Sequence, residues 1–206
     1  LPAGTSAPVM IITVCMAAVL AGALYSLLLA VAAINFNADQ TIIGTAMNML
    51  GTAMATVIVK AINVAANPDD VSSTIQYVEQ KKAFYFNVGS MELSWFMVIA
   101  VLLLIAAHIV HYKTKFGLRL MACGEHPQAA DSVGINVYKM RYIGVLISGA
   151  LGGLGGLVFV VPTSTNFNAT VAGYGFLALA VMIFGNWKPL NIALAFLLFG
   201  MFKCIA

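Results

Sequence analysis

The sequence predicts an all-α fold, a polytopic transmembrane helical bundle, and three observations support this. Only 8% of the 206 residues are charged and 62% are hydrophobic, whereas soluble domains carry about 25% charged residues. The mean hydropathy is +0.97. The apolar residues also form long blocks rather than amphipathic stripes, which is typical of membrane spans. We expect a single transmembrane domain over residues 1–206, truncated at both ends because the chain lacks an initial Met and stops inside an apolar run.

Four apolar stretches are long enough to cross a bilayer core of about 30 Å, which takes about 20 helical residues. They cover residues 9–34, 42–62, 93–112 and 142–161. A fifth apolar region, 174–206, is interrupted at 185–189, and its first piece would rise only about 16 Å as a helix. We therefore expect a broken or re-entrant helix near residues 174–189.

The basic residues predict the orientation, since cytoplasmic loops carry an excess of Lys and Arg. The loop 113–141 holds five bases and two acids, whereas the loop 63–92 holds four acids and two bases. We expect 113–141 to be cytoplasmic and 63–92 to be extracytoplasmic. Alternation then places 35–41 inside and 162–173 outside. Asn67 and Pro68, followed by two acids, also predict a surface helix over 68–80.

No catalytic constellation or metal site is visible. The three cysteines have no ligand spacing, and His108 and His111 have no Cys, Asp or Glu beside them at such spacing. We interpret the two histidines as interfacial anchors. A Gly-x-x-x-x-Gly-Lys-Ser/Thr loop is also missing, so this chain does not hydrolyse ATP by that route. We expect no cofactor on this chain.

The segment 149–156 is the most glycine-rich part of the sequence. Gly149 and Gly153, like Gly152 and Gly156, have the small-xxx-small spacing that lets helices approach closely. The segment follows no strand and opens no βαβ unit, so we interpret it as a helix-packing face, either within the chain or against a second subunit.

Polar residues recur on one face of the second span, at Thr41, Thr45, Asn48 and Thr52. Polar groups in hydrocarbon are costly unless they are paired or face a cavity. This face therefore looks at neighbouring helices or at a wet pathway, and the spacing does not decide between them.

A short sequence repeat relates the two halves of the chain. Asn-Phe-Asn-Ala at 35–38 recurs at 166–169, and at the same offset Gly22 aligns with Gly153. The predicted orientation places the two copies on opposite sides of the membrane, as an inverted repeat requires.

The loop 113–141 contains a short predicted helix. Pro127 suits its first turn and Gly134 suits its C-terminal cap, with about two turns between them. Ala129 and Ala130 keep one side of it small. Such a rigid helix could dock in a cleft on a cytosolic partner, whose movement would then push the attached spans. The alternative is an ordinary loop helix at the membrane interface.

At this loop the sequence resembles the coupling helix of ABC importer permeases. Residues 128–134 match the Ala-Ala-x-x-x-Gly motif core, although Gln128 stands where the family often has Glu. The strings 117–141, 36–48 and 172–180 are similar to the simple-sugar and nucleoside branch of the branched-chain amino-acid permease superfamily. Purine-nucleoside importer permeases resemble it most, over residues 20–206.

The resemblance implies an ABC importer permease fold in the plasma membrane, surrounded by lipid, with no enzymatic activity and no nucleic-acid partner. It implies a cytosolic ABC ATPase that holds ATP and Mg, a second permease in a homo- or heterodimer, and an extracytoplasmic substrate-binding protein. The implied coupling residues are Glu125, Pro127, Ala129, Ala130, Asp131 and Gly134. By position, the substrate pathway would contain Thr41, Thr45, Asn48, Asn166, Phe167 and Asn168.

Several functions stay open at this stage. The expected one is ATP-driven nucleoside uptake, and the same machine importing ribose or another simple sugar is an alternative. A stand-alone secondary transporter would require a coupling group such as an intramembrane carboxylate, and none of the seven acids lies in a predicted span. A structural membrane scaffold would lack a polar pathway.

Overall fold

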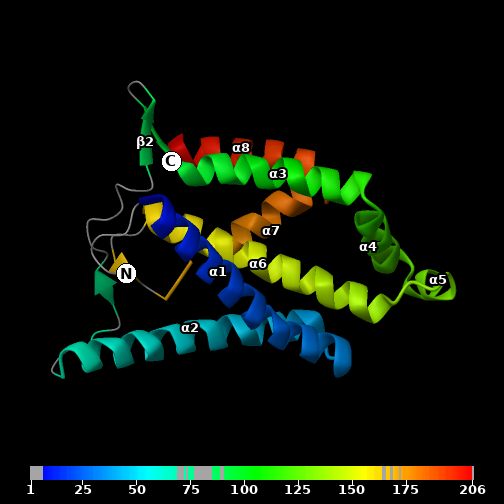
Figure 1. The fold of residues 1–206 in the computed structure, drawn as a ribbon, viewed down its shortest axis with the longest axis horizontal. Coiled ribbons are helices and arrows are strands. Elements are labelled where there is room, and N and C mark those ends of the chain that lie inside the picture. Colours follow the sequence, from blue (N-terminus) through cyan, green and yellow to red (C-terminus); the bar gives the residue numbers. More distant parts are fainter. Residues whose placement is uncertain are drawn as a thin grey trace.

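Four long helices form the body of the molecule (Figure 1). They are α1 (Ala7–Ala30), extended by the π-helix η1 (Val31–Asn35), α2 (Gln40–Ala66), α3 (Trp95–Lys113) and α6 (Val137–Thr163). The computed structural model describes residues 7–68, 72, 74–76, 85–88, 91–163, 166–167, 169–171 and 173–205. In these ranges, these four helices are the ones long and apolar enough to cross a membrane. The predicted polytopic helical fold is therefore confirmed.

The shorter elements lie between and beyond these helices. The helices are α4 (Lys115–Glu125), α5 (Pro127–Ser132), α7 (Tyr174–Phe184) and α8 (Pro189–Ile205), and the strands are β1 (Ile75–Gln76), β2 (Tyr85–Val88), β3 (Met91–Ser94) and β4 (Asn166–Phe167). β1 pairs antiparallel with β4, and β2 with β3. The prediction of a surface helix over 68–80 is wrong at residues 75–76, which form the strand β1. Residues 69–71, 73 and 77–80 lie outside the described ranges.

The loops occupy opposite ends of the bundle. α4 and α5 lie at one end, and the strands lie at the other (Figure 1). The connector after η1 is at the α5 end, since Asn37 shares a groove with Pro127 and Asp131. At the far end, β1 and β4 bring the loops after α2 and α6 together. This arrangement agrees with the predicted alternation of the loops.

α1 and α6 cross at glycines. A Cβ atom on Gly22 would lie 2.9 Å from the Gly153 Cα, and one on Gly153 would lie 3.2 Å from the Gly22 Cα, so only hydrogen fits at the crossing. The Gly149 and Gly153 face thus packs within the chain. Gly152 and Gly156 differ, because a Cβ there would meet no described atom within 4 Å, and both border a cleft.

The contacts at this crossing have the symmetry that the short sequence repeat requires. The offset that aligns Gly22 with Gly153 also aligns Ala18 with Gly149. A side chain on Gly22 would strike the Gly149 carbonyl, and one on Gly153 would strike the equivalent Ala18 carbonyl. Exchanging the two copies therefore exchanges these contacts. This reciprocity supports an inverted repeat, with its pseudo-two-fold axis passing through the crossing.

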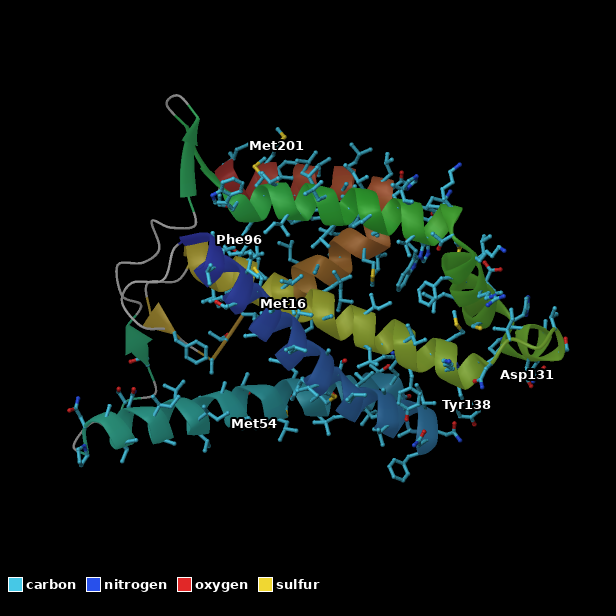
Figure 2. All side chains as sticks on the ribbon, in the orientation of Figure 1. Met16, Met54, Phe96, Asp131, Tyr138 and Met201 are labelled. Atoms are coloured by element: carbon cyan, nitrogen blue, oxygen red, sulfur yellow. The ribbon has the colours of Figure 1, made fainter. Side chains whose placement is uncertain are left out.

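Two small cores hold the ends of the bundle. Phe96, only 2% exposed, packs between residues of α1 and α6 near the strands, and Figure 2 shows it at that end. The second core contains Cys123, Ala130 and Met140 and ties α4, α5 and α6 together. Asp131, at the opposite end in Figure 2, marks this second region.

The predicted broken helix is confirmed. α7 ends at Phe184 and α8 begins at Pro189, with Asn186 (φ 49°) and Trp187 (φ 59°) in the left-handed region between them. Gly185 is buried in this turn, since a Cβ there would lie 2.7 Å from the Ile192 Cα. α8 then runs beside α3 (Figure 1).

Candidate functional site

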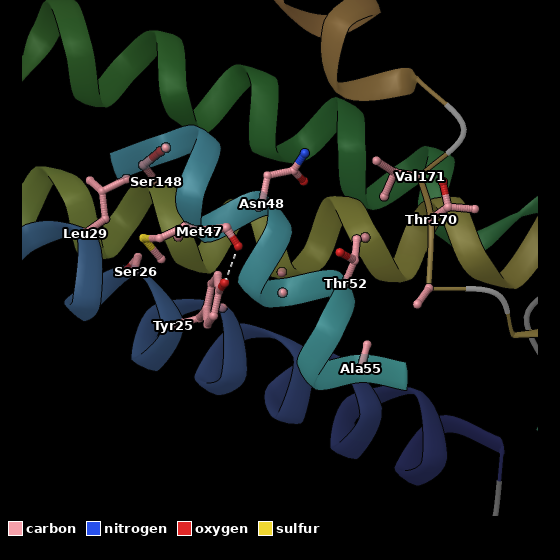
Figure 3. Close-up of a pocket in the computed structure, with 18 of the residues that line it drawn as sticks. Tyr25, Ser26, Leu29, Met47, Asn48, Thr52, Ala55, Ser148, Thr170 and Val171 are labelled. Carbon is pink, nitrogen blue, oxygen red and sulfur yellow. Dashed lines mark hydrogen bonds between the residues drawn. The ribbon is translucent and has the colours of Figure 1, made fainter. Parts of the chain in front are cut away.

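An open cleft of about 690 Å³ lies between α1, α2, α6 and the segment after β4 (Figure 3). α2 contributes Gly44, Met47, Asn48, Gly51, Thr52 and Ala55 to it. The remaining walls are Gly22, Tyr25, Ser26 and Leu29 from α1, Val145, Ser148, Gly149, Gly152, Gly153, Gly156 and Val160 from α6, and Phe167, Ala169, Thr170 and Val171. Its size is typical of a small-molecule site.

The cleft combines apolar walls with neutral polar groups. Among the described residues that line it, none is charged. The hydroxyls of Ser26 and Thr52 donate to backbone carbonyls of their own helices, at 2.8 and 2.9 Å. The Asn48 amide makes no hydrogen bond to any described residue, so its donors and its acceptor are available to a solute. Such a surface suits an uncharged polar molecule.

Tyr25 fixes one wall of the cleft. Its hydroxyl donates to the Met47 carbonyl at 2.5 Å, which joins α1 to α2 (dashed line in Figure 3). A Cβ on Gly51 would lie 3.2 Å from this hydroxyl oxygen, so the glycine leaves room for the ring. The phenol therefore forms a fixed aromatic surface at the cleft.

The sequence predicted part of this site. Asn48 and Phe167 line the cleft, whereas Thr41 and Thr45 lie exposed on the same helix but not among its lining residues within the described chain. Asn166 pairs with Gln76 through β4, its side chain lying outside the described part, and Asn168 lies outside it altogether.

Sequence reasoning missed Tyr25, Ser26 and Ser148, which line the cleft. A signal for two of them existed. Ser26 stands four residues after Gly22, and Ser148 four before Gly152, so each shares a helix face with a glycine of the packing or cleft surface.

The predicted helix of the loop 113–141 is α5, and its two ends are as expected. Pro127 is its first residue, and Gly134 follows it with φ +82°. The Gly134 amide donates to the Asp131 carbonyl at 2.9 Å, and the Ile135 amide donates to the Ala130 carbonyl at 3.1 Å. These two bonds form a Schellman motif, which ends the helix. Glu125 belongs to α4 instead, so α5 is shorter than the span 125–134.

The two alanines of α5 have different surroundings. Ala130 is only 4% exposed and packs against Cys123 and Met140, with Phe116, Leu120, Ile135 and Val137 around them. Ala129 is exposed, and Val133 is 79% exposed beside it. Ala130 therefore fixes α5 to its own chain, and the Ala129 side is open to a partner.

α4 connects α5 to α3 through a tight elbow. The Thr114 hydroxyl donates to the Val110 carbonyl at 2.6 Å and accepts from the Gly117 amide at 3.2 Å, which caps α4. A Cβ on the buried Gly117 would lie 2.7 Å from the His111 carbonyl carbon. α5 is thus mechanically linked to α3 through α4 and directly to α6.

The end of α1 also rests near α5. Asn37 and Ile34 share a groove of about 220 Å³ with Gln128 and Asp131. The Tyr142 hydroxyl of α6 donates to the Asn35 side-chain oxygen at 2.9 Å. This end of η1 therefore meets the loop, and the same α1 helix carries Tyr25 into the cleft.

Asp39 starts α2 after this connector. Its carboxylate accepts from the amides of Thr41 (2.7 Å) and Ile42 (3.4 Å), as an N-cap does. These backbone hydrogen bonds lower the pKa of Asp39. The cap defines where the cleft-lining helix begins.

The family model for the branched-chain amino acid transport system permease component matches residues 3–205. The guanosine ABC transporter permease protein NupQ of Bacillus subtilis is 43% identical over 90% of this chain. The nucleoside ABC transporter permease protein NupC of Lactococcus lactis is 41% identical over 91% of it. NupB, a further nucleoside ABC transporter permease protein of L. lactis, is 32% identical over 52% of the chain and 30% of its own length.

The chain spans about 60% of the length of NupQ and of NupC. No solved structure shows a significant match. Because the family model covers almost the whole chain, and the helical spans and the cleft agree with a membrane permease, the chain belongs to the family of branched-chain amino acid transport system permease components.

Proposed function

We propose that this chain is the membrane-spanning permease subunit of an ATP-driven ABC importer for nucleosides. The transport part of the proposal depends chiefly on one structural observation, that α6 belongs to both regions of the candidate site. Its first turns carry Met140 in the core that holds α5, and its later turns carry Ser148 and Gly152 along the cleft. A push on α5 therefore reaches the cleft through one continuous helix.

The cleft chemistry supports a nucleoside as the cargo. A nucleoside is uncharged and joins a planar base to a polar sugar. The described lining supplies aromatic rings from Tyr25 and Phe167, and the Asn48 amide can both donate and accept hydrogen bonds. The names of NupQ and NupC, for guanosine and nucleosides, point to the same class.

The partners follow from the exposed surfaces and the relatives. A cytosolic ATPase that binds ATP and Mg would dock on the Ala129 side of α5. The charge distribution supports a cytoplasmic position for this loop and an extracytoplasmic one for the strands, where a substrate-binding protein would deliver the solute. The cleft is open to one side, so a second permease subunit, identical or different, would complete the pathway. The relation to both NupC and NupB of one organism is consistent with a different one.

Reconstitution of the full-length protein with its ATPase tests this function. Proteoliposomes should take up labelled guanosine only when ATP is supplied, and unlabelled adenosine should compete while ribose should not. Uptake of ribose without guanosine would replace the cargo assignment. Guanosine uptake driven by an ion gradient, without the ATPase, would contradict the importer mechanism.

A further inference from the structure

A second cavity, of about 310 Å³, lies where α3 meets the break between α7 and α8. It is separate from the cleft, with which it shares no lining residue in the described chain. It lies near Lys113, the last residue of α3, and therefore at the membrane boundary where α4 begins. Its lining residues are His108, Tyr112, Lys188, Pro189, Leu190 and Asn191.

The cavity has a mainly apolar lining with a few hydrogen-bond donors and one positive charge. Lys188 supplies an ammonium group, Asn191 an amide and Tyr112 a hydroxyl, and no acid is present among its described lining residues. The α8 helix also begins here. Its Ile192 amide donates to the Lys188 carbonyl at 2.9 Å, which leaves the amides of Leu190 and Asn191 without an intrahelical acceptor. Such a helix start favours a negative group.

His108 adds an imidazole ring to this wall. Its Nδ1 is buried and has no hydrogen-bond partner among the described residues. Its ring lies beside that of Tyr112, with the ring centroids 5.1 Å apart. A buried Nδ1 is closed to a molecule in the cavity, so the ring can offer such a molecule only its Nε2.

The surroundings indicate a lipid rather than a soluble anion. Three residues deeper along each helix, Ile105 (49% exposed) and Leu194 (61% exposed) present apolar side chains on the same faces as His108 and Asn191. Trp187, 67% exposed, lies directly before Lys188, and tryptophan is enriched at membrane interfaces. A molecule bound here would have its polar end at the boundary and apolar chains below it.

We propose that this cavity binds the phosphate of an anionic phospholipid, with the acyl chains lying along Ile105 and Leu194. Lys188 and the first turn of α8 attract the phosphate, and the His108 Nε2 and the Tyr112 hydroxyl hydrogen-bond to its oxygens. Basic pockets between transmembrane helices bind anionic headgroups in this way. The bound lipid would brace α8 against α3 at the level of the elbow that leads to α5.

Native mass spectrometry of the full-length protein in detergent tests this site. Phosphatidylglycerol should be retained about fivefold more than phosphatidylcholine with the same acyl chains, and Lys188→Gln should remove most of this preference, since one surface lysine is worth about a factor of five. Lys115→Gln is the matched control, because Lys115 is exposed at the same boundary but is not a lining residue. His108→Phe, which keeps a ring, should also weaken phosphatidylglycerol retention.

Three results would overturn the proposal. One is equal retention of the two lipids by the parent protein, and another is an equal loss in the Lys188 and Lys115 variants, which would indicate nonspecific charge attraction. The third is binding of glycerol 3-phosphate as tightly as phosphatidylglycerol, which would indicate a soluble phosphate ligand. If Lys188→Gln does not fold, unchanged lipid preference in His108→Phe decides against the site.

Discussion

At the scale of single residues, glycines decide how closely α1 and α6 approach. The crossing leaves no space for a side chain at Gly22 of α1 or Gly153 of α6. A Cβ added at Gly155, also on α6, would meet no described atom within 4 Å. Backbone contact of this kind gives membrane helices their packing energy, because lipid provides no hydrophobic drive between them.

Gly153→Ala should therefore lower the melting temperature of the purified protein, since forcing extra volume into a packed contact costs about 1–3 kcal/mol. Gly155→Ala, which adds the same methyl group in open space, should leave the temperature unchanged or slightly higher. A thermal shift assay in detergent compares the two. Equal melting temperatures would show that the crossing is looser than the structure indicates.

Gly134 is needed for its backbone conformation rather than for space. A Cβ there would meet no described atom within 4 Å, but φ is +82°. Gly134→Ala should destabilise the end of α5 by about 1–2 kcal/mol, visible as faster amide hydrogen exchange over 127–136. Gly124→Ala in α4, with open space and an ordinary φ, is the control and should not speed exchange there.

Asn48 is the residue whose role in transport is most directly testable. Asn48→Leu should reduce guanosine uptake about tenfold. A hydrogen bond to the solute contributes about 1 kcal/mol, and a leucine at this position would also leave a polar group of the bound solute without a hydrogen-bond partner. Thr45→Val removes a polar group outside the described cleft lining and should change uptake little. Similar uptake in both variants would reassign Asn48 to packing.

The residue scale also shows what sequence can and cannot predict. Asn48 was predictable because its polar face is a local pattern along one helix. Tyr25 was not, because its place at the cleft depends on its hydrogen bond to Met47 on the next helix. Sequence spacing carries no information about that contact.

At the scale of elements, α5 was predictable at its ends and not on its faces. Pro127 and Gly134 are local signals that act within one turn of the helix. The burial of Ala130 depends on Cys123 and Met140 from two other helices, so sequence patterns alone predicted the same role for both alanines. The β1–β4 pairing was missed for a similar reason, since it joins Ile75 to Phe167, which lie far apart in the sequence.

Because Ala129 is exposed and Ala130 is buried, substitutions at the two positions can distinguish an effect on docking from an effect on folding. Ala129→Arg should leave the melting temperature unchanged but uncouple ATP hydrolysis from uptake, because an arginine would protrude from the surface on which we propose that the ATPase docks. Ala130→Arg should instead lower the melting temperature, since it forces a long charged side chain into a small apolar core. Measuring ATPase activity, uptake and melting together distinguishes the two effects. Wild-type uptake by Ala129→Arg would contradict the docking role.

At the scale of the whole molecule, the fold separates the end that holds α5, where we propose that the ATPase docks, from the end that holds the strands, where we propose that the solute arrives. α5 and the η1 connector meet at one end, the strands meet at the other, and α1 and α6 cross between them (Figure 1). Both crossing helices line the cleft. A displacement of α5 would therefore act on the cleft from two sides, through α6 directly and through the groove at the end of α1.

This arrangement requires the two ends to lie on opposite sides of the membrane, with α5 in the cytoplasm. Val133→Cys, at a position 79% exposed, should react with a membrane-impermeant maleimide only in inside-out vesicles. Thr74→Cys, exposed beside β1, should react only in right-side-out vesicles. The parent chain, with its partly buried Cys15 and its buried Cys123, gives the background labelling to be subtracted. Labelling of position 133 from outside would show that the topology is the reverse of the one proposed. In that case a cytosolic ATPase would have no access to α5.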